Sequence, residues 1–237
     1  MFNEEPLTPN CESVRESGAH ACVGISPFNG YYTASRIADL VAWAKRSFDY
    51  YHFFVPDAAA AYTLEALGYE PKKARQKARR QGNLVYNKIS RALAEQGVHD
   101  AKRHILDSAR LDTNPRYREL HAEVTGLFEK DEEFRTETMG SSEWVLAKRL
   151  PPGCSPTPRQ RELAVRYFLA ELPLFLDTPT IVGRPSSVFV YHQRVTYLER
   201  LYQGELARRP DLAQGFLVVA PDEVTPDEDR SEMVLPV

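Results

Sequence analysis

Apolar residues near the start of the chain fall into short continuous runs that alternate with longer stretches of helical spacing. Residues 21–26 and 47–56 form compact apolar or aromatic runs bounded by proline, which is typical of buried strands. Residues 34–48 and 58–67 instead place apolar side chains three or four positions apart, as in an amphipathic helix. This alternation of strands and helices predicts a parallel sheet with right-handed crossovers.

The remaining chain adds helices in the middle and strands near the end. Residues 70–128 and 159–176 have helical spacing, whereas 187–191 and 215–220 are again short apolar runs. Strand signals therefore occur in the first and last quarters of the chain, with a helical segment between them. We expect an α/β fold: one doubly wound domain over residues 19–220, with a parallel sheet and a helical insert.

The two ends of the chain differ from this domain. Residues 1–18 contain proline, asparagine and glycine with little periodicity, and they predict a flexible arm. Residues 221–237 predict an acidic tail. No apolar run approaches the roughly 20 residues that span a bilayer, and residues 1–16 are polar, unlike a secretory signal. We therefore expect a cytoplasmic protein that has no membrane partner.

The formal net charge of -3 over 237 residues hides an uneven distribution. Residues 71–94 contain basic side chains and no acidic ones, whereas a face that is only solvated usually mixes both signs. Such a helix suits phosphate groups bound without sequence readout, and its few aromatic residues favour a structured RNA over stacked single-stranded bases. The candidate RNA contacts are Lys72, Lys73, Arg75, Lys77, Arg79, Arg80, Lys88 and Arg91.

Several kinds of site have no support in the sequence. Three cysteines without a C-x-x-C pair do not make a disulfide framework or a cysteine-rich zinc module, and the six histidines lack a metal-ligand spacing. Neither G-x-G-x-x-G nor a P-loop is present. We therefore expect no metal and no cofactor.

Three polar residues follow predicted strands: Ser26, Asp57 and Tyr191. Ligands of open α/β sheets bind beyond the carboxyl ends of the strands, so these positions are candidates for a site. A serine before a proline is more simply explained as a turn or helix cap.

Residues 24–28 also invite comparison with the G-x-S-x-G nucleophile elbow of hydrolases, but they read Gly-Ile-Ser-Pro-Phe. The elbow uses the N–H of the residue after the nucleophile as an oxyanion donor, and Pro27 has no N–H. A hydrolase triad of Ser26, Asp177 and His192 is therefore a weaker alternative.

Tyr167 and Glu171 are four positions apart on a predicted helix and share one face. Glu171 lies in the apolar run 170–176, where a carboxylate needs a partner, and a ligand ammonium group would be suitable. The alternative places Tyr167 in the core and Glu171 in solvent, and these residues alone do not decide between the two.

Two spaced motifs carry a resemblance to a known family. Residues 20–26 read His-Ala-Cys-Val-Gly-Ile-Ser, and residues 167–173 read Tyr-Phe-Leu-Ala-Glu-Leu-Pro. Together they resemble the two signatures of the cyclodipeptide synthases, which make cyclic dipeptides from aminoacyl-tRNAs. Cys22 and Phe168 stand where the family has aliphatic residues, and both departures keep an apolar side chain, so they concern pocket shape more than chemistry.

Further residues extend the resemblance over most of the chain. Asn29, Tyr191 and His192 resemble the set that marks one branch of the family, and the basic helix is also similar. The resemblance implies a Rossmann-like fold similar to the catalytic domain of class I aminoacyl-tRNA synthetases. It also implies two aminoacyl-tRNAs as substrates, no ATP because their esters are already activated, and a monomer.

The resemblance further implies a ping-pong acyl transfer through an aminoacyl-Ser26 and a dipeptidyl-enzyme. In this hypothesis Glu171 and Tyr167 bind the α-ammonium group, and Tyr191 relays or orients a proton. The rival is a tRNA-binding protein without catalysis. The sequence does not specify which two amino acids are joined. The expected substrate-binding residues are Gly24, Asn29, His192, Cys22, Val23, Leu174 and Phe189.

Overall fold

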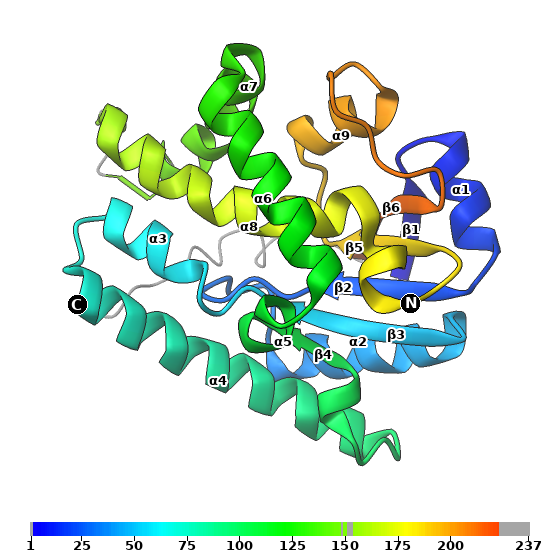
Figure 1. Cartoon of the computed structure of the whole chain (residues 1–237). Helices are drawn as coiled ribbons and strands as arrows, with labels where there is room; N and C mark the ends of the chain where they lie inside the picture. The colour runs from blue at the N-terminus through cyan, green and yellow to red at the C-terminus, as the bar shows by residue number, and fades with distance from the viewer. Residues whose placement is uncertain (1, 148, 151–153, 223–237) are drawn as a thin grey trace.

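The computed structural model describes residues 2–147, 149–150 and 154–222. In this part of the chain, six strands form one sheet in the order β1-β6-β5-β2-β3-β4 (Figure 1). β1 pairs antiparallel with β6, and the other neighbours are parallel. The strands are β1 (Phe2–Pro6), β2 (His20–Gly24), β3 (Tyr50–Val55), β4 (Ile105–Asp107), β5 (Ser187–Tyr191) and β6 (Gln214–Pro221).

The strand order reverses at β2, which positions the site. From β2 the chain proceeds to β3 and β4 on one side, and later to β5 and β6 on the other. β2 is buried along its whole length because both faces of the sheet are covered, which explains its continuous apolar sequence. A crevice for ligands is expected at such a switch point, beyond the carboxyl ends of β2 and β5.

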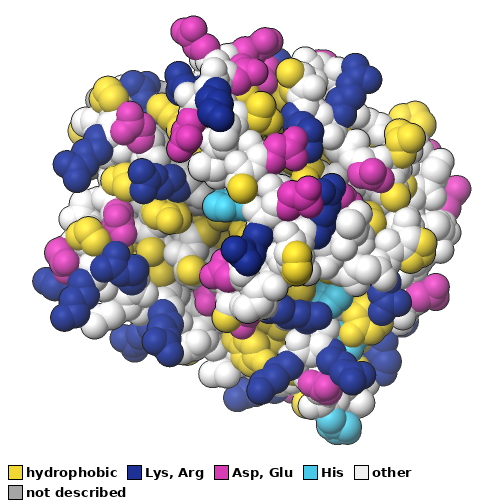
Figure 2. Space-filling view, viewed as in Figure 1, with side chains coloured by type: hydrophobic (Ala, Val, Ile, Leu, Met, Phe, Trp, Pro, Cys, Tyr) yellow, Lys and Arg dark blue, Asp and Glu magenta, His cyan; other side chains and the backbone are white. Residues whose placement is uncertain are grey.

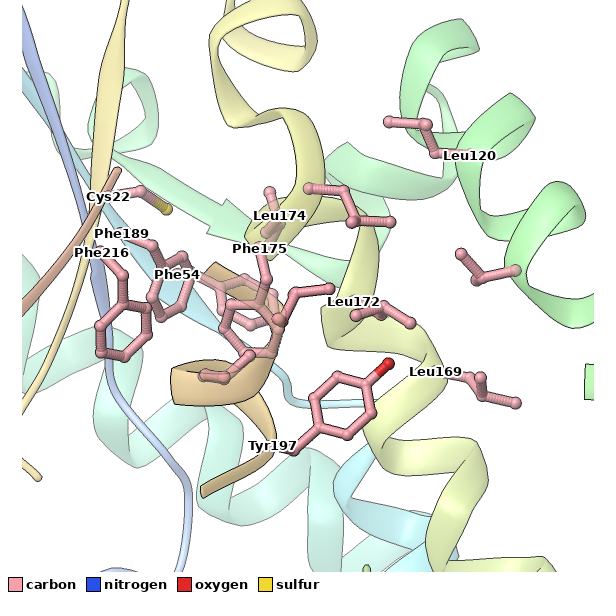
Figure 3. Close-up of a cluster of buried hydrophobic side chains, with 14 of the residues drawn as sticks. Cys22, Phe54, Leu120, Leu169, Leu172, Leu174, Phe175, Phe189, Tyr197 and Phe216 are labelled. Carbon is pink, nitrogen blue, oxygen red and sulfur yellow. The ribbon is translucent and has the colours of Figure 1, made fainter. Parts of the chain in front are cut away.

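Helices cover both faces of the sheet (Figure 1). α2 and α4 pack on one face, and α6, α8 and α9 lie on the other, where they meet the aromatic core around Phe189 and Phe216 (Figure 3). The helices are α1 (Pro9–Glu16), α2 (Ala34–Ser47), α3 (Ala60–Ala66), α4 (Pro71–Glu95), α5 (Ser108–Asp112), α6 (Pro115–Lys130), α7 (Glu132–Ala147), α8 (Pro158–Val182) and α9 (Thr196–Gln203), with a 3-10 turn at Ala101–Arg103.

The expected flexible arm is instead ordered into β1 and α1, and this is a correction. The side chain of Thr8 accepts a hydrogen bond from the backbone N–H of Cys11 and caps α1, which buries Cys11 and Val14. Glu4 of β1 receives hydrogen bonds from Arg15 at 2.6 Å and from the indole of Trp43 at 2.8 Å. The order of this segment thus depends on contacts with distant parts of the chain.

Two other expectations need comment. The predicted helical insert also contains the short strand β4, which adds an edge to the sheet beside β3. Residues 223–237, most of the predicted acidic tail, lie outside the described residues.

Candidate active site

Ser26 lies just beyond the carboxyl end of β2, where it meets the end of β5. The backbone N–H of Ile25 donates to the carbonyl of Phe54 at 2.9 Å and holds this point against β3. The Ser26 Oγ is 3.2 Å from the hydroxyl of Tyr191, the last residue of β5. Parallel pairing of β2 and β5 brings the two side chains together although they are 165 positions apart.

Helix α8 contributes Tyr167 and Glu171 to the same place. The hydroxyl of Tyr167 is hydrogen-bonded to both Ser26 and Glu171. Burial raises the pKa of Glu171 to about 8, although the hydrogen bond from Tyr167 acts in the opposite direction. A cation that binds beside such a buried carboxyl group stabilises its negatively charged form.

Tyr191 is a protonated phenol at neutral pH. Burial raises the pKa of Tyr191, while its hydrogen bonds to Ser26 and Asn29 act in the opposite direction. Its hydroxyl can therefore donate to, or accept from, the serine oxygen. Ser26, Tyr167, Glu171 and Tyr191, the four expected catalytic residues, thus form one connected group.

Asn29 and His192 form a second connected pair beside this group. The amide nitrogen of Asn29 donates to Nε2 of His192 at 3.0 Å, which requires a neutral imidazole. Burial lowers the pKa of His192 to about 4. The ring of Tyr31 stacks on His192 with centroids 4.2 Å apart, and the Tyr31 N–H donates to Asn29. The imidazole therefore fixes the loop after Ser26.

The hydrolase alternative loses its support in this arrangement. Asp177, which has a non-helical backbone inside α8, is paired with Arg116 at 2.9 Å. Its other oxygen accepts a hydrogen bond from the N–H of Thr180. Asp177 and His192 thus have separate partners and do not form the orienting pair of a catalytic triad.

Gly24 leaves room for the aromatic rings at the site. A Cβ at this position would lie 2.9 Å from the ring of Phe189 and 3.6 Å from that of Tyr191. The glycine is thus explained by packing as well as by any approach of a ligand.

The structure separates the expected pocket residues. Cys22, Leu174 and Phe189 pack in the core on the α8 side of the sheet, whereas Val23 packs on the other side against α2. Alternate residues of a strand face opposite ways, so Val23 does not share a pocket with Cys22. All four are at most 1% exposed, and they support the site from within the core.

Two residues near the site were missed by sequence reasoning. Tyr32 is buried, and its pKa lies well above the usual value because of burial and of Tyr191 nearby. Burial lowers the pKa of Arg149, whereas Tyr167 and Tyr191 raise it, so a guanidinium lies within electrostatic reach of both phenols. Tyr32 could have been suspected from its place in the loop after Ser26, but Arg149 has no signal in its irregular segment.

The basic helix α4 has one buried and one basic face. Ala74, Ala78 and Gly82 face the protein, and Figure 2 shows Lys and Arg side chains along this edge of the molecule. Two of the predicted contacts have internal partners: Lys77 donates to the hydroxyl of Tyr69, and Lys88 donates to the carbonyl of Tyr32. The exposed ones are Lys72, Lys73, Arg75, Arg79, Arg80 and Arg91.

The described residues contain neither a candidate metal site nor a membrane span. No three His, Cys, Asp or Glu side chains among them come close enough to share a metal ion. No helix in the same residues is long and apolar enough to cross a membrane.

Comparison with known proteins identifies the family. The family model described as cyclodipeptide synthase matches residues 2–221. The chain belongs to the cyclodipeptide synthase family. It is 34% identical to the cyclo(L-tyrosyl-L-tyrosyl) synthase of Mycobacterium tuberculosis over 221 residues, which are 93% of this chain and 76% of that protein. The family resemblance predicted from the two motifs is thus confirmed.

Solved structures agree with this assignment. A cyclodipeptide synthase from Bacillus thermoamylovorans superposes with a TM-score of 0.86 at 30% identity, covering 94% of this chain and 97% of that one. A tyrosyl-tRNA synthetase from Archaeoglobus fulgidus shares the fold alone, with a TM-score of 0.50 at 15% identity over 93% of this chain and 60% of its own. The predicted Rossmann-like fold related to class I tRNA synthetases is confirmed, and this cyclodipeptide synthase is a tRNA-dependent aminoacyltransferase.

Proposed function

We propose that this chain joins two amino acids from aminoacyl-tRNAs into a diketopiperazine by a ping-pong mechanism through Ser26. The observation that carries the proposal is the convergence of Ser26, Tyr191, Tyr167 and Glu171 beyond the ends of β2 and β5. The group supplies a nucleophile, two hydroxyl partners and a carboxyl group suited to an ammonium ion.

In the first half-reaction Ser26 Oγ attacks the carbonyl carbon of the first aminoacyl ester. The bond from Oγ to that carbon forms, the bond to the terminal ribose oxygen breaks, and the serine proton ends on the ribose oxygen of the released tRNA. The Tyr191 hydroxyl at 3.2 Å orients Oγ and passes the proton. The esters are already activated, so no nucleotide is consumed.

Glu171 and Tyr167 hold the α-ammonium group of the bound aminoacyl moiety. Binding of the cation favours the ionised form of a carboxyl whose pKa is otherwise about 8. The same carboxylate lies beside the ammonium group and takes a proton from it, and this proton returns to solvent before the next cycle. The amine so formed is the nucleophile of the next step.

In the second half-reaction the amine of aminoacyl-Ser26 attacks the carbonyl carbon of the second aminoacyl-tRNA. A peptide bond forms, the second tRNA leaves with the proton, and dipeptidyl-Ser26 remains. The new terminal amine attacks the Ser26 ester, the ring closes, and the proton lost by nitrogen returns to Oγ. Tyr191 is suitably placed to deliver that proton, since its hydroxyl contacts the serine oxygen.

Helix α4 holds tRNA through its exposed basic residues. We assign this role to Lys72, Lys73, Arg75, Arg79, Arg80 and Arg91 rather than to Lys77 and Lys88, whose ammonium groups bind Tyr69 and Tyr32. The Asn29–His192 hydrogen bond next to Tyr191 supports membership of the Asn-Tyr-His branch. One chain contains the whole proposed catalytic group, so we propose a monomer that acts where charged tRNA is made, in the cytoplasm.

The test is production of cyclic dipeptides from mixtures of charged tRNAs, followed by mass spectrometry. The unaltered protein should release diketopiperazines and form a labelled aminoacyl adduct, and Ser26→Ala should do neither. Ser35→Ala, at an exposed serine of α2, is the matched control and should remain active. No cyclic dipeptide from any mixture would contradict the proposal, and tRNA binding without an adduct would indicate the non-catalytic alternative.

A further inference from the structure

The turn that follows Ser26 contains an unusual backbone conformation. The N–H of Asn29 donates to the carbonyl of Ser26 at 3.4 Å, with Pro27 and Phe28 as the two central residues. Phe28 has a φ of 64°, and it is the one residue besides glycine with positive φ in the described part of the chain. Proline followed by positive φ is the pattern of a type II turn, in which the third position is normally glycine or asparagine.

A phenylalanine in this conformation needs compensation. The left-handed region brings Cβ close to the following backbone, and a bulky residue remains there only when its surroundings hold it. Strain of this kind occurs in positions where a loop must keep one shape. Here the strained residue lies between Ser26 and Asn29.

The compensation comes from helices α3 and α4. The Phe28 side chain packs on a small apolar cluster that also includes Tyr167 of the catalytic group. The buried members of this cluster are Ala60, Ala61, Leu64, Ala74 and Ala78. The ring of Phe28 therefore connects the nucleophile turn to Tyr167 and to the inner face of the basic helix.

A second contact ties the same loop to α4. Lys88 donates from Nζ to the carbonyl of Tyr32 at 3.1 Å, six positions after Ser26. At its middle the loop is joined through Asn29 to His192, the residue that follows β5. These contacts fix the loop from Asn29 to Tyr32. The turn at Ser26 itself is held on α3 and α4 by Phe28.

We propose that Phe28 is a positioning residue for the acylation of Ser26, and this rests on the proposed function. Its ring, seated on α3 and α4, anchors the turn to these helices so that Oγ faces Tyr191 and Tyr167. Glycine would suit the turn's backbone better but would remove this anchor, so the strained phenylalanine stands here for geometry rather than for stability.

The experiment compares Phe28→Gly, Phe28→Tyr and the unaltered protein in single-turnover acylation with labelled aminoacyl-tRNA. For Phe28→Gly we expect the saturating acylation rate constant to fall by roughly tenfold or more, as misplaced nucleophiles do. The half-saturating tRNA concentration should not change, because the basic face of α4 is intact. Phe28→Tyr keeps the ring and should restore most of the rate.

Leu120→Ala is the matched control, because it removes a buried leucine of α6 from a core cluster that does not include Phe28. Acylation is measured below the melting temperature of every variant. Normal acylation by Phe28→Gly would overturn the inference, as would an equal loss of rate in Leu120→Ala at equal loss of stability. Failure of the unaltered protein to form an adduct would overturn the proposed function as well, so the two failures are distinguishable.

Discussion

Glu171 shows how one buried side chain sets the chemistry of the site. It lies on α8 with Tyr167 as its hydrogen-bond partner, and burial raises its pKa to about 8. Below this pH the empty site contains a neutral carboxyl, and above it a carboxylate. Only the carboxylate attracts the α-ammonium group of the substrate, so substrate capture depends on the ionisation of this residue.

We predict that kcat/KM for cyclic dipeptide formation rises between about pH 6 and 8, because this ratio reports the free enzyme. Glu171→Gln keeps the shape and loses the charge. This variant should have a kcat/KM about 100-fold lower, and its kcat/KM should no longer show the increase with pH that ionisation of Glu171 causes. Rates across this pH range for both proteins provide the measurement, and an identical pH profile in Glu171→Gln would contradict the role.

The catalytic residues could be predicted from sequence to the extent that local spacing determines them. Tyr167 and Glu171 share a helix face at any tertiary arrangement, and Ser26 follows a recognisable strand. Tyr32 and Arg149 could not be found in this way, because their proximity to Tyr191 depends on how distant segments pack. Likewise, the number of basic residues in α4 could not show that Lys88 donates a hydrogen bond to the carbonyl of Tyr32.

At the scale of elements, periodic apolar patterns predicted β2, β3, β5, β6, α2 and α8, whose burial is continuous or one-sided. Helix α7 (Glu132–Ala147) was missed because residues 129–158 have little periodicity, and the strands that were missed are short and depend on partners. β1 has alternating burial on the edge of β6, and β4 contains three residues. Neither is stable alone, so its sequence has little signal of its own.

Helix α4 supports a prediction about tRNA binding. Arg79 and Arg80 are exposed, whereas the preceding Ala78 is buried against the protein. Replacing both with glutamate should weaken tRNA binding and lower the slope of log affinity against log salt by about 1 for each phosphate group that no longer has a basic partner. Filter binding over a salt series measures both quantities.

The matched control is Arg118→Glu with Lys130→Glu, which reverses two exposed charges on α6 instead. Both double variants change the net charge equally, so a difference in their tRNA affinity must come from where the replaced charges lie. Equal affinities in the two would indicate that tRNA lies elsewhere or responds to net charge alone.

At the scale of the whole molecule, a buried histidine pair at the amino-terminal end of the sheet joins three strands. His20 of β2 bonds to Ser187 of β5 at 2.7 Å and to His52 of β3 at 2.8 Å. Arg110 reaches the far nitrogen of His52 at 3.4 Å. The first residue of the serine motif is therefore a cross-link of the central strands, at the end of β2 opposite to Ser26.

Both histidines resist protonation in the folded protein. Burial, and then Arg184, lower the pKa of His20 to about 3. Burial, His20 and Arg110 lower the pKa of His52 to about 2, with smaller effects from His104 and Arg184. The unfolded chain binds these protons near pH 6.5 and the folded one does not. Their contribution to stability is therefore complete above pH 6.5 and decreases as the pH falls toward about 3.

We predict that lowering the pH from about 7.5 to 5 reduces the free energy of unfolding by about 2 kcal/mol for each histidine. His52→Asn keeps a polar partner for His20 and removes one titrating group, so its loss over this range should be smaller by about 2 kcal/mol. Urea unfolding at the two pH values measures the difference. His99→Asn, at an exposed histidine, should keep the unaltered pH dependence. An equal loss of stability in His52→Asn and the unaltered protein would show that the buried pair does not set the acid limit of the fold.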